Sequence, residues 1–250
     1  VFSVFFGIGL AALGERGRGL IGVIDQVAHV MLKVTAYVMW TAPAAVLAAV
    51  AATITTEGLG ILGTYGKFIG GYYVALLVLW AVLLGLGAMV IGPRVRALVS
   101  MIREPLLLAF STASSEAAYP KTLEQLERFG VSPRIASFVL PLGYSFNLDG
   151  SMMYCTFATL FIAQAYGIDL SGGQLITLLL LLLVTSKGIA GVPRASLVVL
   201  AATLPHFGIP DAGLLLVLAV DQFLDMGRSA TNVVGNSIAS SVVAKWEGEL

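Results

Sequence analysis

The sequence is poor in charge and in cysteine. Of its 250 residues only 11% are charged and 58% are hydrophobic, whereas a soluble domain carries about 25% charged residues. The formal net charge is zero, so nothing in the composition suggests a nucleic-acid partner. The single cysteine, Cys155, lies in an apolar run and has no second cysteine in this chain with which to form a disulfide or a metal site, so we expect it to be a packing residue.

Long charge-free stretches accompany this shortage of charge. No charged residue occurs between Lys67 and Arg94, and about 20 apolar residues suffice to cross a bilayer as a helix. Residues 34–56, 150–168 and 170–186 are also free of charge. The sequence therefore predicts an all-α polytopic membrane protein.

The chain starts inside an apolar segment, Val-Phe-Ser-Val-Phe-Phe, with no initiator methionine and no charged region ahead of it. This beginning does not resemble a signal peptide. We expect the chain to be a fragment that lacks an N-terminal part.

The distribution of lysine and arginine predicts how the segments cross the membrane. The loops 54–66, 165–174 and 205–213 contain neither residue, and loops rich in them lie on the cytoplasmic side. The cytoplasmic set comprises Arg16, Arg18, Arg94, Arg96, Arg103, Lys121, Arg128, Arg134 and Lys245. The predicted spans are 34–54 outward, 68–92 inward, 135–164 outward and 214–244 inward. This places the C-terminus in the cytoplasm, and we expect the protein in the cell (inner) membrane.

Two segments begin and end on the same side of the membrane. Residues 105–120 turn at Ser111-Thr-Ala-Ser-Ser-Glu116, and residues 174–204 break at Lys187-Gly-Ile-Ala-Gly-Val-Pro-Arg194. Non-helical backbone is tolerated at membrane depth only where it is buried in protein or lines a cavity. We interpret both segments as re-entrant hairpins that enter from opposite faces, as is typical of secondary transporters. The alternative is an ordinary loop or a kinked helix in each case.

The span 135–164 contains turn-forming residues at its centre, in Gly143-Tyr-Ser-Phe-Asn-Leu-Asp-Gly-Ser151. Asn and Asp-Gly favour turns, so we expect two half-helices joined by an unwound piece. The carbonyl groups freed there, with an adjacent aspartate, suit a hard cation such as Na⁺. A surface turn between two short helices is the alternative.

A polar seam runs through the apolar segment near the end of the chain. It consists of Asp221, Asp225, Arg228, Ser229, Asn232 and Asn236. Their offsets from Asp221 are 4, 7, 8, 11 and 15 residues, so on a helix they line one face. Ionisable groups at membrane depth usually face a pathway or a ligand. The alternative is a helix in a soluble core, in which Asp225 and Arg228 pair with each other.

Four motifs in this order resemble the dicarboxylate/amino acid:cation symporter family, the glutamate transporters and their relatives. They are Ser111-Thr-Ala-Ser-Ser-Glu116, Asn147-Leu-Asp-Gly-Ser151, Gly188-Ile-Ala-Gly-Val-Pro193 and Asp225-Met-Gly-Arg-Ser-Ala-Thr-Asn232. The resemblance implies a glutamate-transporter-like fold of eight spans, with two opposed re-entrant helical hairpins and a broken transmembrane helix, in a homotrimer. Residues 1–66 would then be partial scaffold, the end of the fourth span and the fifth span. Residues 67–250 would be the transport core, made of the sixth span, the hairpins 105–120 and 174–204, the broken span 135–164 and the last span 214–244.

The resemblance also implies a substrate site. Arg228 would pair with the side-chain carboxylate of the substrate, which its planar fork suits, and Asp225 would take the amino group. Hydroxyl and amide groups in the tip of the first hairpin would bind the α-carboxylate, and backbone of the second hairpin would close over the substrate. The implied set is Ser114, Ser115, Ser151, Gly191, Val192, Asp225, Arg228, Ser229 and Asn232.

The coupling ions that the resemblance implies are Na⁺ and/or H⁺, with no organic cofactor. One cation site would be formed by Gly143, Asn147, Asn232 and Asn236. A second, mostly of backbone atoms, would be formed by Ser145, Leu148, Ser186 and Ile189. Asp149 would belong to a third.

Three residues depart from the family pattern. Asn236 stands where sodium-coupled archaeal members carry Asp, and a neutral amide gives a cation less, which makes a weaker site or proton coupling plausible. Arg194 adds a positive charge where many members have Gly, and the sequence leaves its role open. Ala113 replaces an arginine that some members hold in the first hairpin.

The resemblance therefore implies a secondary active symporter that imports small anionic substrates. Because the Asp225 carboxylate repels a plain diacid and pairs with an ammonium group, we expect glutamate or aspartate as substrate; the alternative is a C4-dicarboxylate such as succinate, malate or fumarate. A channel would need a continuous polar pore. An intramembrane enzyme that used Ser145 as a nucleophile would need a base within reach, and His29 and His206 fall near the ends of predicted spans, so we expect no enzymatic activity.

Overall fold

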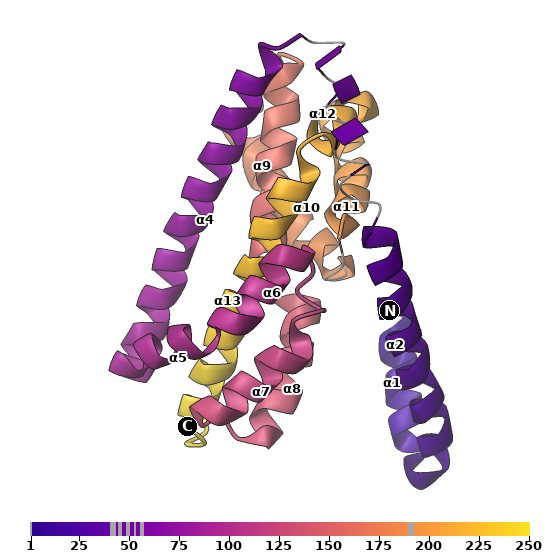
Figure 1. Cartoon of the computed structure of the whole chain (residues 1–250), viewed down its shortest axis with the longest axis vertical. Coiled ribbons are helices and arrows are strands. Elements are labelled where there is room, and N and C mark those ends of the chain that lie inside the picture. The colour runs from indigo at the N-terminus through magenta and orange to yellow at the C-terminus, as the bar shows by residue number, and fades with distance from the viewer. Residues whose placement is uncertain are drawn as a thin grey trace. The chain divides into compact units, whose positions relative to one another are not determined.

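The computed structural model describes residues 2–40, 44, 47–48, 51–52, 54–55, 58–189 and 193–250. Within these ranges the regular structure is helical and no strand is found, which agrees with the prediction of an all-α protein. The chain divides into two compact units, Val1–Ala48 and Ala49–Leu250, whose elements are drawn in Figure 1. Each unit is described by itself.

Helices α1 (Phe2–Ala12) and α2 (Arg18–Met39) belong to the first unit. The 3-10 turn η1 (Gly14–Gly17) lies between them in the sequence. Apolar side chains such as Phe5 and Ile8 are exposed on α1, as are Ile21 and Val27 on α2. This unit falls within the predicted scaffold segment 1–66. Much of the predicted span 34–54 lies outside the described residues.

The second unit begins with a long apolar helix. Helix α4 (Ile61–Ile91), η2 (Gly92–Arg94) and α5 (Val95–Met101) follow one another without interruption. Together they form the one helical stretch in the described part of the chain that is long and apolar enough to cross a membrane. The predicted span 68–92 falls inside α4 and η2, but the helix begins earlier, at Ile61.

Two pairs of helices occupy the segments predicted as hairpins. The first helix pair is α6 (Arg103–Thr112) and α7 (Tyr119–Phe129), joined by a turn over 113–118. The second helix pair is α10 (Gly172–Thr185) with η3 (Ser186–Gly188) and α11 (Ala195–Thr203) with η4 (Leu204–Phe207). The first pair continues to residue 129 rather than 120, because charged residues that look like a loop in the sequence form the exposed side of α7.

Helices α8 (Pro133–Phe146) and α9 (Asp149–Ala165) lie between these two pairs in the sequence. The helical conformation is interrupted at Asn147 and Leu148. The interruption is narrower than the predicted unwound piece 143–151, since residues 143–146 remain in α8 and residues 149–151 already belong to α9.

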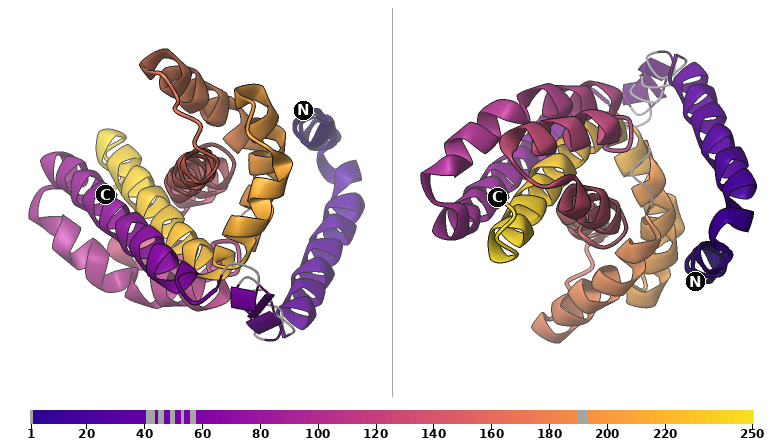
Figure 2. Two further views of the ribbon diagram at one scale, coloured as in Figure 1. Left: turned by 90° about the horizontal axis from the view of Figure 1, so that it is seen from above. Right: turned by 90° about the horizontal axis from the view of Figure 1, so that it is seen from below.

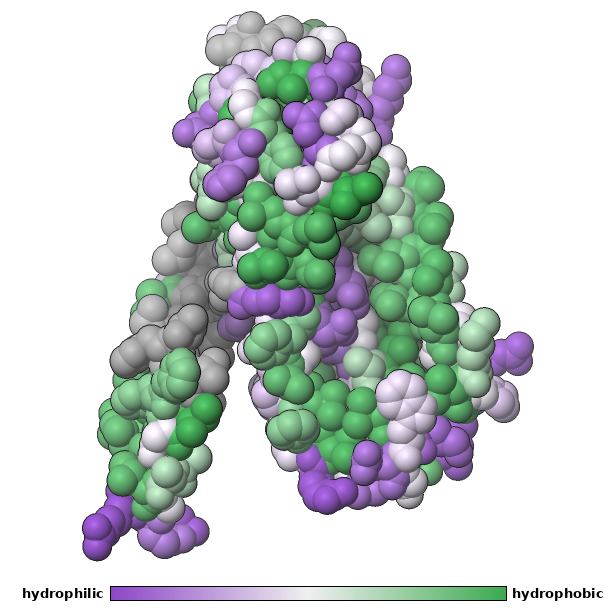
Figure 3. Space-filling view, turned by 180° about the vertical axis from the view of Figure 1, so that it is seen from behind, coloured by the Kyte–Doolittle hydropathy of each residue, from purple (hydrophilic) through white to green (hydrophobic). Residues whose placement is uncertain are grey.

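The chain ends in η5 (Asp211–Gly213), α12 (Leu214–Leu218) and α13 (Asp221–Trp246). Helix α13 packs against α4, α6, α8 and α9, and Figures 1 and 2 show it running between α4 on one side and α8 and α9 on the other. Consequently most of its residues between Asp221 and Ala244 are buried. Figure 3 shows apolar side chains over much of the visible face, hydrophilic ones gathered at its upper and lower ends, and a further hydrophilic patch near its middle.

Candidate functional site

The six residues of the polar seam all lie on α13, and all are buried. Glycines let neighbouring helices approach this face closely. A Cβ atom added to Gly150 of α9 would lie 2.2 Å from the carbonyl oxygen of Arg228, and one added to Gly143 of α8 would lie 2.3 Å from Oδ1 of Asn236. The seam is therefore covered by the two helices that meet at Asn147 and Leu148.

The strongest electrostatic feature of the seam is an ion pair between Arg228 and Asp225. Nε of Arg228 lies 2.6 Å from Oδ1 of Asp225, and both side chains are completely buried. A buried pair of this kind tolerates the loss of neither partner, because the remaining charge would be left uncompensated. A pair between Asp225 and Arg228 was also expected if the helix lay in the core of a soluble protein. Here, however, polar groups from other helices surround the pair.

Serine 151 and Asn232 extend this network. The hydroxyl oxygen of Ser151 accepts hydrogen bonds from Nη1 of Arg228 at 3.3 Å and from Nδ2 of Asn232 at 3.2 Å. Oδ1 of Asn232 accepts a hydrogen bond from the backbone N–H of Gly150 at 2.9 Å, at the start of α9. The structure thus brings Ser151, Arg228 and Asn232 together, as expected of neighbouring members of one binding site.

Asp221, the first residue of the seam and of α13, has partners that could not be predicted from the sequence. The hydroxyl of Tyr154 donates a hydrogen bond of 2.5 Å to its Oδ1, and Nε of Arg194 lies 3.5 Å from its Oδ2. The backbone N–H of Arg194 donates a second hydrogen bond of 2.5 Å, to Oδ2 of Asp225. Sequence reasoning missed Tyr154 because nothing local distinguishes it from the apolar residues around it on α9.

The turn of the first helix pair contacts the same region of α13. Ser114 and Ser115 are buried in this turn, and Ala113 before them has a left-handed backbone with φ of 51°. Ala109 of α6 and Ala118 at the end of the turn pack against Val233, the residue that follows Asn232. The backbone carbonyl of Ser115 accepts a hydrogen bond of 2.9 Å from the hydroxyl of Tyr144 on α8, so the turn is fixed to two helices.

Among the buried side-chain atoms that lack a hydrogen-bond partner in the described part of the chain, four belong to residues of the predicted binding sites and take no part in the ion pairs above. They are Oγ of Ser115, Oγ of Ser229, Nδ2 of Asn236 and Oδ2 of Asp149. A buried polar atom that lacks a partner is costly unless a ligand, an ion or water satisfies it. These groups can serve a polar ligand, and the oxygen atoms among them can also serve a cation.

Residues predicted for the first cation site meet where α8 and α9 join. Nδ2 of Asn147 donates a hydrogen bond of 3.1 Å to Oδ1 of Asn236, and Gly143 faces Asn236 as described above. The backbone N–H of Asn147 donates to the carbonyl of Gly143 at 2.7 Å. The side chain of Asn232 instead contacts Gly150 and Ser151, so a contribution of Asn232 to this site is left to its backbone.

Asp149, predicted for the third cation site, faces Gly235 of α13. A Cβ atom on Gly235 would lie 2.1 Å from Oδ2 of Asp149, so only glycine allows this approach. No group of three or more His, Cys, Asp or Glu side chains within the described ranges is placed to hold a metal ion. A cation bound here would therefore depend on the carboxylate of Asp149 together with amide, hydroxyl and backbone oxygens, and oxygen donors suit Na⁺ rather than a transition metal.

The second predicted cation site joins the segment 145–148 to the segment 186–189. Nζ of Lys187 donates a hydrogen bond to the carbonyl of Phe146, and Leu148 and Ile189 belong to one buried apolar cluster. Ser186 is buried and Ser145 is exposed. Gly191 and Val192, predicted to close over the substrate, lie outside the described residues.

Comparisons with known proteins show what the sequence of the chain is similar to. The sequence profile described as "Sodium:dicarboxylate symporter family" matches residues 1–246. The chain is 44% identical over 247 residues to the "Proton/sodium-glutamate symport protein" of Bacillus subtilis (strain 168), covering 99% of this chain and 58% of the relative. It is 48% identical over 247 residues to the "Proton/glutamate-aspartate symporter" of Escherichia coli (strain K12), covering 98% and 56%.

A relative whose name states another substrate is similar to almost the same degree. The "C4-dicarboxylate transport protein" of Bacillus subtilis (strain 168) is 41% identical over 249 residues, which cover 99% of this chain and 59% of the relative. The chain thus spans between 56% and 59% of the length of these three relatives.

Proposed function

The chain belongs to the sodium:dicarboxylate symporter family, and on that premise we propose that its protein is a secondary active symporter. It imports acidic amino acids, glutamate or aspartate, together with Na⁺ and/or H⁺ by alternating access. Relatives named as proton/sodium-glutamate and proton/glutamate-aspartate symporters support both the substrate class and the two coupling ions.

The observation that carries this proposal is the buried pair of Arg228 and Asp225. An acidic amino acid offers a carboxylate to the first and an ammonium group to the second. Each protein side chain can therefore exchange its partner for a group of the substrate, so that neither Arg228 nor Asp225 is left as an unpaired buried charge. The α-carboxylate that remains would take donors from the turn at Ser114 and Ser115. The donors of Asn232 and the hydroxyl of Ser151 lie beside this pair, where they can orient the substrate further.

Import of a C4-dicarboxylate is the second candidate, and the relative named as a C4-dicarboxylate transport protein supports it. A diacid would satisfy Arg228 but offers no cation to Asp225. The carboxylate of Asp225 would then keep Arg228 or Arg194 as its partner. For this reason we favour the amino acids.

We also propose how the chain is placed in the membrane. The first and second helix pairs are re-entrant hairpins from opposite sides, and α8 and α9 are the halves of one broken span. The polar interruption at Asn147 and the buried turn at Ser114 support this arrangement, because non-helical backbone at membrane depth must be buried or line a cavity. The protein is a homotrimer in the cell (inner) membrane, with its C-terminus in the cytoplasm.

Uptake into proteoliposomes that contain the full-length protein tests the function. Labelled aspartate should accumulate when an inward Na⁺ or proton gradient is imposed. Accumulation should vanish when both gradients are collapsed; uptake indifferent to both would rule out symport. Competition then separates the two substrate classes, since succinate that displaces aspartate at far lower concentration than glutamate would establish the second candidate.

A further inference from the structure

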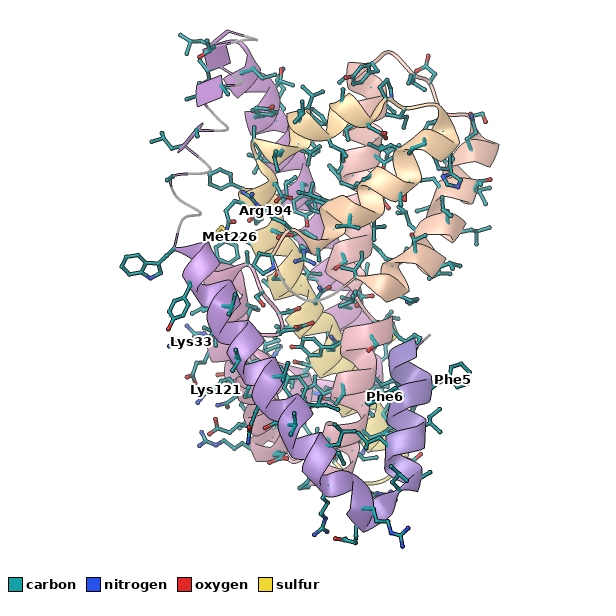
Figure 4. All side chains as sticks on the ribbon, turned by 90° about the vertical axis from the view of Figure 1, so that its right-hand side faces the viewer. Phe5, Phe6, Lys33, Lys121, Arg194 and Met226 are labelled. Carbon is teal, nitrogen blue, oxygen red and sulfur yellow. The ribbon has the colours of Figure 1, made fainter. Side chains whose placement is uncertain are left out.

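Arg194 makes two contacts with the polar seam that the proposed function does not use. Its backbone N–H donates to Asp225, and its guanidinium group lies 3.5 Å from the fully buried carboxylate of Asp221, while 38% of its own side chain is exposed. It sits at the start of α11, in the second helix pair. Figure 4 shows it near Met226, the residue that follows Asp225 on α13.

The backbone of Arg194 is in a conformation that favours glycine. Its φ is 64°, and Ala113 in the turn of the first helix pair is the other non-glycine residue with positive φ within the described ranges. A side chain at such a position strains the backbone. An arginine held there is a reason to look for a function of its side chain.

At the N-terminal end of the seam, around Asp221 and Asp225, the charges balance only when Arg194 is counted. Asp221 and Asp225 contribute two negative charges, one helical turn apart, and Arg228 and Arg194 contribute two positive ones. Without Arg194, the carboxylate of Asp221 would retain a hydrogen bond from Tyr154 but no cationic partner among the contacts described. The site would then carry one net negative charge.

We propose that Arg194 is a specificity-determining residue, whose guanidinium group neutralises Asp221 and so sets how well a diacid competes with an acidic amino acid. The proposal rests on the proposed function. A C4-dicarboxylate brings two negative charges, whereas glutamate or aspartate brings a net charge of one because of its ammonium group. Removing the positive charge of Arg194 therefore penalises the diacid more than the amino acid.

Binding competition on the purified full-length protein measures this effect. The quantity is the ratio of the half-inhibitory concentrations of succinate and glutamate against labelled aspartate, in the parent, Arg194→Gln, Asp221→Asn and the double variant. Arg194→Gln should raise the ratio about tenfold, the order expected for one unit charge across a site of intermediate dielectric constant. Asp221→Asn should lower it, and the double variant should return it towards the parent value, because the net charge is restored.

Two further variants separate charge from shape. Arg194→Lys keeps the charge and should keep the ratio, whereas Arg128→Gln removes an arginine that pairs with Glu124 on the exposed side of α7 and should change nothing. A ratio that changes equally in Arg194→Lys and Arg194→Gln, or a double variant no closer to the parent than Arg194→Gln, would overturn the proposal. If Asp221→Asn does not fold, the comparison of the two Arg194 variants decides.

Experiments on the same full-length protein distinguish a failure of the proposed symport function from a failure of the proposal for Arg194. Loss of gradient-driven uptake in the parent contradicts symport, but the binding ratio still tests Arg194. Normal symport with an unchanged ratio in Arg194→Gln contradicts only the assignment of Arg194.

Discussion

The guanidinium group of Arg228 lies 2.6 Å from the carboxylate of Asp225, one helical turn earlier on α13, and neither side chain is exposed. Two opposite charges so close and so deeply buried hold each other in place. They also form the smallest unit that can recognise a molecule carrying both a carboxylate and an ammonium group. The first prediction follows from separating them.

Arg228→Ala should abolish recognition of the side-chain carboxylate of the substrate. Charged hydrogen bonds are worth about 1.5–3 kcal/mol, so the affinity for aspartate should fall by at least about tenfold, with comparatively little effect on neutral amino acids. Arg228→Lys keeps the charge but not the planar fork, so its affinity for aspartate should lie between those of the parent and Arg228→Ala. Binding is measured by competition, with Arg128→Ala as the control; near-normal affinity for aspartate in Arg228→Ala would remove Arg228 from this role.

Asn236→Asp should strengthen the dependence of substrate binding on sodium. The side chain of Asn236 contacts Asn147 and faces Gly143, and a carboxylate there adds a formal negative charge to the first predicted cation site. Binding of Na⁺ and of substrate then favour each other, since such coupling is reciprocal. Substrate affinity is measured against sodium concentration at fixed pH, and superimposable curves for parent and variant would show that position 236 does not bind the cation.

Gly150→Ala should loosen the contact between α9 and α13. The added Cβ atom would lie 2.2 Å from the carbonyl oxygen of Arg228, so the helices must separate, at a cost of about 1–3 kcal/mol. Both thermal stability and substrate affinity should drop, because the N–H of Gly150 also binds Asn232. Gly173→Ala on α10 is the matched control, since a Cβ atom there meets nothing within 4 Å; equal losses in both variants would contradict this explanation.

Glu249 should make stability depend on acid pH. A hydrogen bond from Ser132, and then one from Arg134, lower the pKa of Glu249 below that of an ordinary glutamate. A carboxyl group with a lowered pKa stabilises the folded state above the ordinary value of about 4.3, and this contribution is lost as the pH falls through the lower pKa of the folded protein. Thermal unfolding from pH 7 to pH 3 should show an acid-dependent component that Glu249→Gln lacks.

The effect of Glu249 should be modest, since Arg134 is exposed and solvent screens such pairs. High salt should reduce it further. A parent and a Glu249→Gln variant that lose stability in parallel over the whole range would show that this carboxyl group does not anchor the C-terminal residues to the start of α8.

The spacing of the polar residues was enough to determine which of them share a face of the last helix. Periodicity is a local property, and Asp221 to Asn236 do lie on one uninterrupted helix. The two helix pairs and the interruption at Asn147 were likewise indicated by local turn chemistry, although the interruption proved shorter than predicted. The membership of the symporter family, carried by four motifs, is confirmed by the profile match.

Tertiary structure decided which partner each seam residue meets. Tyr154 and Asp221 are 67 residues apart in the sequence, and no local pattern links them. No local pattern links Arg194 to Asp221 either. Their meeting depends on where α9 packs against α13 and α11 packs against α9. The packing of α9 on α13 depends in turn on close approaches at positions such as Gly150. Side chains on one helix share a face because of its period, but contacts between helices are set by the shapes of the packed surfaces.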